Sequence, residues 1–270
     1  MKLLGTSLLP DASTQEGAST FTAVNPATGE TLEPDFQEAG AEAVDRAAGL
    51  RFTKRRTEYL LRRWVCKQAV AAATGMPGDL PSLARIEVAN HPTGAPYVQV
   101  DGAPLTIDVS LTDRAGWAVC LVGEHRGRVG CDLEIVEPRS AGFVTDFLTP
   151  AEQDYVTSRP GDERDAAANL VWSAKESALK VLQTGLRRDT RSVEVVVAGD
   201  DGDVSAAGWA RLEVRTVEGG LMPGWWRRDG VFLVTVAAER PLPPPTLLVG
   251  STDLASARPA HSWVGRPLSP

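Results

Sequence analysis

Residues 161–185, GDERDAAANLVWSAKESALKVLQTG, constrain the fold most, because they form the strongest helical pattern in the chain. Acidic residues lie in the first turn, Ala and Leu fill the body, and Gly185 follows the last apolar residues. Strand-like segments lie on both sides of this helix. The order of helix, strands, helices and strands predicts an α+β fold rather than a doubly wound parallel sheet.

The strand-like segments fall into two groups. Before the long helix, ARIEV, PYVQV, LTIDVSL, WAVCLV and VGCDLEIV alternate in polarity or run β-branched, and turn sequences such as HPTGAP separate them. After it, RSVEVVVAG, ARLEVRTV and GVFLVTVAA have the same character. LTPAEQDYV predicts a shorter helix, with Pro150 in its first turn after Thr149.

Charge is divided unevenly along the N-terminal part of the chain. Residues 1–50 carry eight acidic residues against two basic ones, whereas residues 51–67 carry seven basic residues against Glu58 alone. The basic segment RFTKRRTEYLLRRWVCKQAV has apolar residues at helical spacing, and Gly75 and Pro77 end it. Its basic face is either a solvated surface or a phosphate-binding surface.

Composition excludes several classes of protein. With 43% hydrophobic residues and a net charge of −7, the chain can form a core and lacks the positive charge of a nucleic-acid binder. Cys66, Cys120 and Cys131 have neither disulfide-framework nor zinc spacing, so we expect buried thiols. The chain shows no signal peptide, and its apolar runs fall short of the ~18 residues of a membrane span. We therefore expect a cytoplasmic protein.

Two acidic residues stand two positions apart in VGCDLEIV. Asp132 and Glu134 point to the same face of this strand, whose other residues are apolar. Two like charges there are costly unless a positive group lies nearby. Mg²⁺ would explain the pair, because it binds one or two carboxylates together with waters and phosphates. An exposed sheet face with two solvated acids would explain it as well.

A second polar pattern lies in the long helix. Trp172, Glu176 and Lys180 are each four residues apart and share one stripe of that helix. An ordinary Glu–Lys surface pair beside an aromatic residue accounts for this spacing. The alternative is that Glu176 is the third carboxylate of a metal site, with Lys180 placed for a phosphate oxygen.

Together, these two segments resemble the 4′-phosphopantetheinyl transferase superfamily. The shared pattern is Gly-x-Asp-x-Glu at residues 130–134, followed by Trp-x-x-Lys-Glu-x-x-x-Lys at residues 172–180. FLTPAEQ with Glu152, TGLRRDTRSVEV, KRRTEYLLRRWVCKQAV and TGAPYV are similar to further segments of that superfamily. The resemblance covers residues 50–240 and indicates the long, pseudo-dimeric type that activates surfactin synthetase.

The resemblance implies an activity and a set of site residues. Coenzyme A would be the substrate, and its 4′-phosphopantetheine would pass to a serine of an acyl or peptidyl carrier protein, leaving adenosine 3′,5′-bisphosphate. Mg²⁺, or Mn²⁺, would be held by Asp132, Glu134 and Glu176, with Glu176 also as the base and Lys180 neutralising phosphate charge. The implied coenzyme A contacts are Arg55, Arg56, Thr112, Lys175 and Lys180. We expect a monomer without nucleic-acid or membrane partners.

The implied fold is an α+β pseudo-dimer of two similar halves, with the active site in the cleft between them. The predicted boundaries are 1–49 for an acidic extension, 50–127 and 128–240 for the halves, and 241–270 for a flexible Pro-rich tail. The second half would carry the metal site. Within the extension, residues 21–49 separately resemble the opening of an aldehyde dehydrogenase, and that likeness stops there.

The sequence departs from the superfamily pattern on the nucleotide side. Asp113 follows Thr112 where a His is usual, Ala95 stands where a Lys or Arg is often found, and Arg62 replaces a common Gly. An acid repels a phosphate, and the neighbouring Arg114 is a candidate to compensate for it. A second hypothesis is therefore a catalytically impaired coenzyme A-binding or regulatory paralogue of the same fold.

Lysine is scarce in this chain, since only five of the 28 basic residues are lysines. Two of the five, Lys175 and Lys180, flank Glu176. Lysine is a compact charge on a flexible stem, which suits a group that follows a moving phosphoryl group. Two of five is also compatible with chance.

Overall fold

The computed structural model describes the backbone of residues 2–7, 9–10, 23–24, 31–32, 53–124, 127–197 and 204–259, and side chains from residue 58 onward within these ranges. Most of the predicted acidic extension, including nearly all of the stretch that resembles an aldehyde dehydrogenase, lies outside the described residues. Its short described strands are β1 (Lys2–Ser7), β2 (Leu9–Pro10), β3 (Ala23–Val24) and β4 (Thr31–Leu32). The helices of the described ranges include none that is both long and apolar enough to span a bilayer.

The predicted long helix is present as α6 (Gly161–Val181), and Gly185 beyond it adopts a positive φ of 52°. Two short helices precede it, α4 (Ala141–Phe147) and α5 (Pro150–Thr157). Thr149 and Glu152 form a capping box at the start of α5, and Pro150 occupies its first turn as predicted. Single turns of 3₁₀ helix follow as η1 (Gly185–Arg187) and η2 (Thr190–Ser192).

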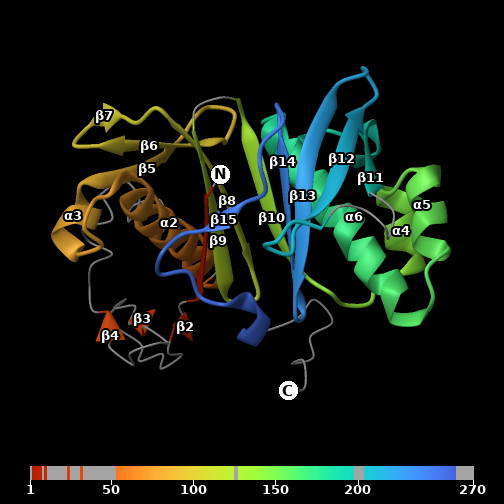
Figure 1. Ribbon diagram of the computed structural model, residues 1–270, viewed down its shortest axis with the longest axis horizontal. Helices are drawn as coiled ribbons and strands as arrows, with labels where there is room; N and C mark the ends of the chain where they lie inside the picture. The colour runs from red at the N-terminus through yellow and green to blue at the C-terminus, as the bar shows by residue number, and fades with distance from the viewer. Residues whose placement is uncertain are drawn as a thin grey trace.

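The first sheet has the strand order β15-β1-β9-β8, and the predicted basic helix α2 (Thr53–Thr74) packs against it (Figure 1). Its longer strands after β1 are β8 (Ile107–Arg114) and β9 (Trp117–Glu124). Leu61, Val65 and Cys66 of α2 share a core with Cys120 and Val122 of β9. Beside it lie α3 (Leu80–Ala84) and a small sheet of β5 (Ile86–Asn90), β6 (Pro96–Val100) and β7 (Ala103–Pro104).

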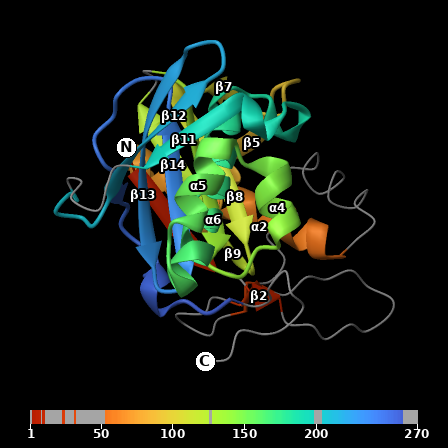
Figure 2. The same cartoon turned by 90° about the vertical axis from the view of Figure 1, so that its right-hand side faces the viewer.

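The second sheet is antiparallel and has the order β10-β14-β13-β12-β11. Its strands are β10 (Val129–Ile135), β11 (Val193–Val197), β12 (Ala210–Thr216), β13 (Leu221–Asp229) and β14 (Phe232–Ala238). Helix α6 covers one face of this sheet (Figures 1 and 2). On the other face, Leu133 and Val234 share a core with Val119 and Leu121 of the first sheet. The arrangement is α+β, as the element order predicted.

Strands β8 and β10 meet along the boundary between the two sheets, and side chains of β8 form the hydrogen bonds there. The Ser110 Oγ accepts the Cys131 N–H at 2.9 Å, and the Thr112 Oγ1 accepts the Leu133 N–H at 3.2 Å. Because residues 110, 112 and 114 lie on one face of β8, Arg114 points the same way. Hydroxyl groups thus satisfy backbone donors of β10 where no neighbouring strand does.

Gly130 allows α6 to lie directly on β10. A Cβ at this position would be 2.0 Å from the Ser177 carbonyl oxygen, which belongs to the backbone of the helix. Any side chain would therefore force the helix away from the strand. The glycine of the Gly-x-Asp-x-Glu pattern is needed for this close packing.

The start of the predicted flexible tail packs against both sheets. The short strand β15 (Thr246–Leu247) pairs with β1, and the 3₁₀ turn η3 (Leu254–Ser256) follows it. The Trp225 Nε1 donates to the Leu242 carbonyl at 2.9 Å, and the Trp117 Nε1 donates to the Arg258 carbonyl at 2.8 Å. Residues 241–259 therefore belong to the folded body, and residues 260–270 lie outside the described residues.

Candidate functional site

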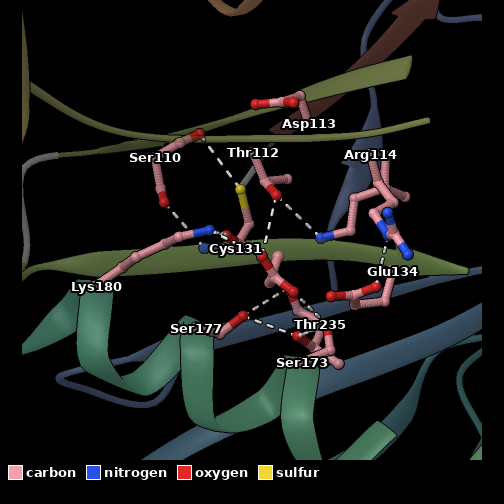
Figure 3. Close-up of polar contacts among 12 residues, drawn as sticks. Ser110, Thr112, Asp113, Arg114, Cys131, Glu134, Ser173, Ser177, Lys180 and Thr235 are labelled. Carbon is pink, nitrogen blue, oxygen red and sulfur yellow. Dashed lines mark hydrogen bonds and ion pairs between the residues drawn. The ribbon is translucent and has the colours of Figure 1, made fainter. Parts of the chain in front are cut away.

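The Asp132 carboxylate of β10 is hydrogen-bonded to residues of β8 and α6. Figure 3 shows these partners, Thr112, Ser173 and Lys180. Its Oδ1 accepts hydrogen bonds from the Thr112 hydroxyl at 3.0 Å and from the Lys180 ammonium at 2.9 Å. Its Oδ2 accepts one from the Ser173 hydroxyl at 2.9 Å. The residue is only 7% exposed, so these three donors replace water around the charge. The structure therefore brings Thr112, Asp132 and Lys180 together.

Glu134, two positions along the strand, is neutralised by two arginines. Its Oε2 lies 2.8 Å from the Arg114 Nε and 3.1 Å from the Arg139 guanidinium. Burial raises the pKa of Glu134, and Asp132 raises it further, whereas the two arginines lower it. Arg114 also pairs with Glu137.

Asp113 has a different partner from the one that the sequence suggested. Arg114, expected to compensate for this acid, is buried against Glu134 and Glu137. Asp113 instead forms an ion pair with Arg62 of α2. Arg62, and not Arg114, therefore balances the charge of Asp113.

Glu176 is the third carboxylate predicted for the site, beside Asp132 and Glu134. Its buried oxygen Oε1 has no hydrogen-bond partner. Burial is the main cause that raises its pKa from 4.5 to about 7, and Asp132 and Glu134 add to this while Lys180 opposes it. The group therefore exists as a mixture of acid and carboxylate near neutral pH. A pKa close to the working pH suits a general base.

A site for Mg²⁺ requires several oxygen donors around one point. Within the described ranges, the structure contains no group of three or more His, Cys, Asp or Glu side chains placed to hold a metal ion. At the predicted set of three carboxylates, the Glu134 Oε2 pairs with two arginines. Mg²⁺ often binds only one or two carboxylates and takes waters and substrate phosphates as its other ligands. Asp132 and the unpartnered Oε1 of Glu176 fit this smaller set in their chemistry.

The two lysines that flank Glu176 occupy different environments. The Lys180 ammonium contacts the Cys131 carbonyl at 2.8 Å and Asp132 at 2.9 Å. Burial lowers the pKa of Lys180, but Asp132, Cys131 and Glu176 together outweigh that effect and the pKa is raised, so the ammonium stays charged. Lys180 therefore supplies one positive charge beside Asp132.

Lys175 points into the protein rather than toward the acidic cluster. Its fully buried ammonium contacts the Glu152 Oε2 at 2.8 Å and the Thr190 carbonyl at 2.9 Å. Burial lowers the pKa of Lys175, and Glu152 counteracts part of that shift. Glu152 also accepts the Val195 N–H at 2.7 Å. Lys175 was expected to contact coenzyme A. Its ammonium instead makes contacts inside the protein, which link α5, α6 and the chain around β11.

The remaining predicted residues are placed less directly. Arg55 and Arg56 lie on α2, and their side chains are outside the described part of the structure. Trp172 packs edge-on against Phe143 and Phe147 of α4, with ring centroids 5.1 and 5.3 Å away. Trp172 therefore packs against α4.

Sequence reasoning missed several polar residues that surround Asp132 and Glu134. They are Ser110, Arg139, Ser173, Ser177 and Thr235. The signal available for two of them was the i, i+4 spacing of serines 173 and 177 on the helix that carries Glu176. The others become visible only when the strands are paired.

Comparison with known proteins agrees with this geometry. The chain is 26% identical over 175 residues to a 4′-phosphopantetheinyl transferase of Bacillus subtilis, a match that covers 64% of this chain and 73% of that protein. Residues 128–208 match the family model described as the 4′-phosphopantetheinyl transferase superfamily. That stretch contains β10 and α6, so the part of the chain that carries Asp132, Glu176 and Lys180 is the part similar to this superfamily.

Proposed function

We propose that this protein transfers 4′-phosphopantetheine from coenzyme A to a serine hydroxyl of an acyl or peptidyl carrier protein. The observation that carries the proposal is the placement of Glu176 beside the Asp132–Lys180 pair, within the segment that matches the superfamily. Glu176 combines an unpartnered oxygen with a pKa of about 7. The product besides the holo carrier protein is adenosine 3′,5′-bisphosphate.

In this reaction Glu176 takes the proton of the serine, directly or through water. The serine oxygen attacks the phosphorus that bears the pantetheine, and the bond from that phosphorus to the bridging oxygen breaks. The bridging oxygen leaves with adenosine 3′,5′-bisphosphate. Lys180 neutralises the charge that develops there, and its flexible stem allows its ammonium to exchange Asp132 for a phosphate oxygen.

The proposed cofactor is Mg²⁺, with Mn²⁺ as an alternative of similar oxygen preference. Asp132 and Glu176 would hold it, and Glu134 would join them only if Arg114 and Arg139 released its Oε2. When bound, the ion would neutralise the diphosphate and orient it. Thr112 would act through Asp132, because its hydroxyl is already hydrogen-bonded to that carboxylate.

The proposed coenzyme A site lies between the two halves of a pseudo-dimer. Arg55 and Arg56 on α2 would reach the 3′-phosphate from the first half, while Asp132 and Glu176 act from the second. The Arg62–Asp113 pair reduces the repulsion that Asp113 alone would exert on a phosphate. We further propose that the protein works as a monomer in the cytoplasm.

The test is a mass-shift assay with coenzyme A, Mg²⁺ and an apo carrier protein from the same genome. Transfer adds about 340 Da to the carrier as a covalent adduct. Glu176→Gln is expected to lower the rate by about 10²-fold or more, as for loss of a general base. Glu163→Gln, which changes an exposed acid on the same helix, is the matched control.

Two results would contradict the proposal. If a control transferase modifies these carriers and this protein modifies none, the transfer activity is excluded. If Glu176→Gln transfers at the wild-type rate, Glu176 is not the base.

The second candidate function is coenzyme A binding without transfer. The observation that favours it is that internal partners already occupy the charged groups, Lys180 on Asp132 and Arg62 on Asp113. Calorimetry separates the two candidates. Binding of coenzyme A that is independent of Mg²⁺, without turnover on any carrier, would support the non-catalytic function.

A further inference from the structure

Three buried hydroxyls, those of Ser173, Ser177 and Thr235, are linked by hydrogen bonds (Figure 3). This series of hydrogen bonds ends on Asp132. The Ser177 Oγ lies 2.8 Å from the Thr235 Oγ1, which lies 2.9 Å from the Ser173 Oγ, and Ser173 in turn lies 2.9 Å from the Asp132 Oδ2. All three hydroxyl-bearing residues are fully buried. Buried side-chain networks of this kind are costly unless every member is satisfied.

Strand pairing explains why the chain forms. Thr235 of β14 is the direct register partner of Asp132 on β10, so the two side chains lie next to each other on the same face of the sheet. Helix α6 packs on that face, and Ser173 and Ser177 are one turn apart along it. The close approach that Gly130 permits brings the helix within hydrogen-bond distance of the strand.

The direction of the hydrogen bonds follows from the chemistry of the terminal group. An ionised carboxylate only accepts, so Ser173 must donate its single hydroxyl proton to Asp132. Ser173 then accepts from Thr235, and Ser177 shares its proton between the hydroxyl and the backbone carbonyl of Thr235. Ser173 and Thr235 each donate toward the carboxylate, and their dipoles stabilise its negative charge.

We propose that Ser173, Thr235 and Ser177 are positioning residues that fix the orientation of the Asp132 carboxylate for binding a divalent cation. This proposal rests on the proposed function, in which Asp132 is a metal ligand. Without the three hydroxyls, the hydrogen-bond donors described at the Asp132 carboxylate would be Thr112 and Lys180, both on Oδ1. Lys180 would then be free to draw both oxygens toward itself. Groups that orient a ligating carboxylate affect metal affinity by about 10–100-fold.

The test is a Mn²⁺ titration followed by electron paramagnetic resonance, which needs neither coenzyme A nor a carrier protein. Ser173→Ala is expected to weaken Mn²⁺ binding by about tenfold, at the lower end of the range for such residues. Thr235→Val removes one hydroxyl at constant volume and is expected to weaken binding by about two- to tenfold, the equivalent of one hydrogen bond. Ser177 keeps the carbonyl of residue 235 as an acceptor, 3.2 Å away, so the Val variant should fold.

Thr235→Ser is the matched variant, because it restores the hydroxyl and removes only a methyl group. Recovery of Mn²⁺ affinity in Thr235→Ser relative to Thr235→Val supports a role for the hydroxyl. An equal loss of Mn²⁺ affinity in Thr235→Ser and Thr235→Val would overturn the proposal. Wild-type Mn²⁺ affinity in both Ser173→Ala and Thr235→Val would overturn it as well. If wild-type protein binds Mn²⁺ and the variants behave as expected while no carrier is modified, the proposed function fails and the positioning role stands.

Discussion

Replacing Glu176 by Gln is expected to stabilise the folded protein at neutral and alkaline pH, although it removes a group proposed to act in the chemistry. The folded state holds this carboxyl in a partly buried position beside Asp132 and Glu134, which raises its pKa from 4.5 to about 7. Above pH 7 the protein must therefore keep an unfavourable charge there. Glutamine has the same shape and carries no charge, so the variant avoids that cost.

The magnitude follows from the change in pKa. One pKa unit corresponds to about 1.4 kcal/mol, so a change from 4.5 to about 7 sets an upper limit of about 3 kcal/mol. Glu176 is not fully buried, and solvent screens part of the interaction. We therefore expect Glu176→Gln to raise the free energy of unfolding by about 1–2 kcal/mol above pH 7.

The pH window follows from the sign of the change. A pKa that is higher in the folded state than in the unfolded state means that the folded protein binds the proton more tightly. This contribution to stability is fully present below pH 4.5 and is lost as the pH rises through about 7. The difference in free energy of unfolding between Glu176→Gln and wild type should therefore grow as the pH rises through that interval. Above it, the difference should stay constant.

The assay is urea denaturation in the presence of a chelator at several pH values from about 5 to about 8. Glu163→Gln, on the exposed surface of the same helix, controls for the general effect of losing one negative charge. A stability difference between wild type and Glu176→Gln that does not grow with pH would refute the assignment of a raised pKa to Glu176. If Glu163→Gln gains as much free energy of unfolding, the stabilisation by Glu176→Gln does not arise from the site.

Two further variants test the packing around the site. Lys175→Met leaves Glu152 buried without its counter-ion and should lower the free energy of unfolding by about 3–5 kcal/mol in urea denaturation; a loss below about 1 kcal/mol would contradict the buried pair. Gly130→Ala places a Cβ 2.0 Å from the Ser177 carbonyl oxygen and should cost about 1–3 kcal/mol or more in thermal denaturation. Gly142→Ala in α4 makes only an ordinary contact, 3.9 Å from the Ser140 Oγ, and should not; equal effects would contradict the close packing.

Local patterns predicted the elements that carry the site. The long helix and its terminal glycine, the basic helix, the start of α5 at Pro150 and the strand that bears Asp132 are all present. These features depend on neighbours within a few residues, so the sequence displays them directly. The positive charge beside Asp132 comes from Lys180, whereas the sequence pattern was interpreted as a Mg²⁺ site with Lys180 placed for a phosphate oxygen.

Long-range partners could not be predicted in the same way. Nothing near Lys175 in the sequence shows that its ammonium turns inward to Glu152, because that contact depends on how α5 and α6 pack. Glu134 pairs with Arg114 of β8, which is distant from it in the sequence. It also pairs with Arg139 of the loop after β10, which lies outside the motif. Like charges on one strand face were correctly predicted to need compensation, but the compensation for Glu134 comes from arginines of the chain itself.

In segments 130–134 and 172–180, the residues beside the charged ones determine how the charged side chains come into contact. Gly130 lets α6 approach β10, and Ser173 and Ser177 then face Asp132 and Thr235 across the contact. A larger residue at position 130 would separate the helix from the strand and break these hydrogen bonds together with the contact of Lys180. Two charged residues at suitable sequence spacing are therefore insufficient for such a site. The small residues beside them set the distance between helix and strand, and the hydroxyls among them set the orientation of the carboxylate.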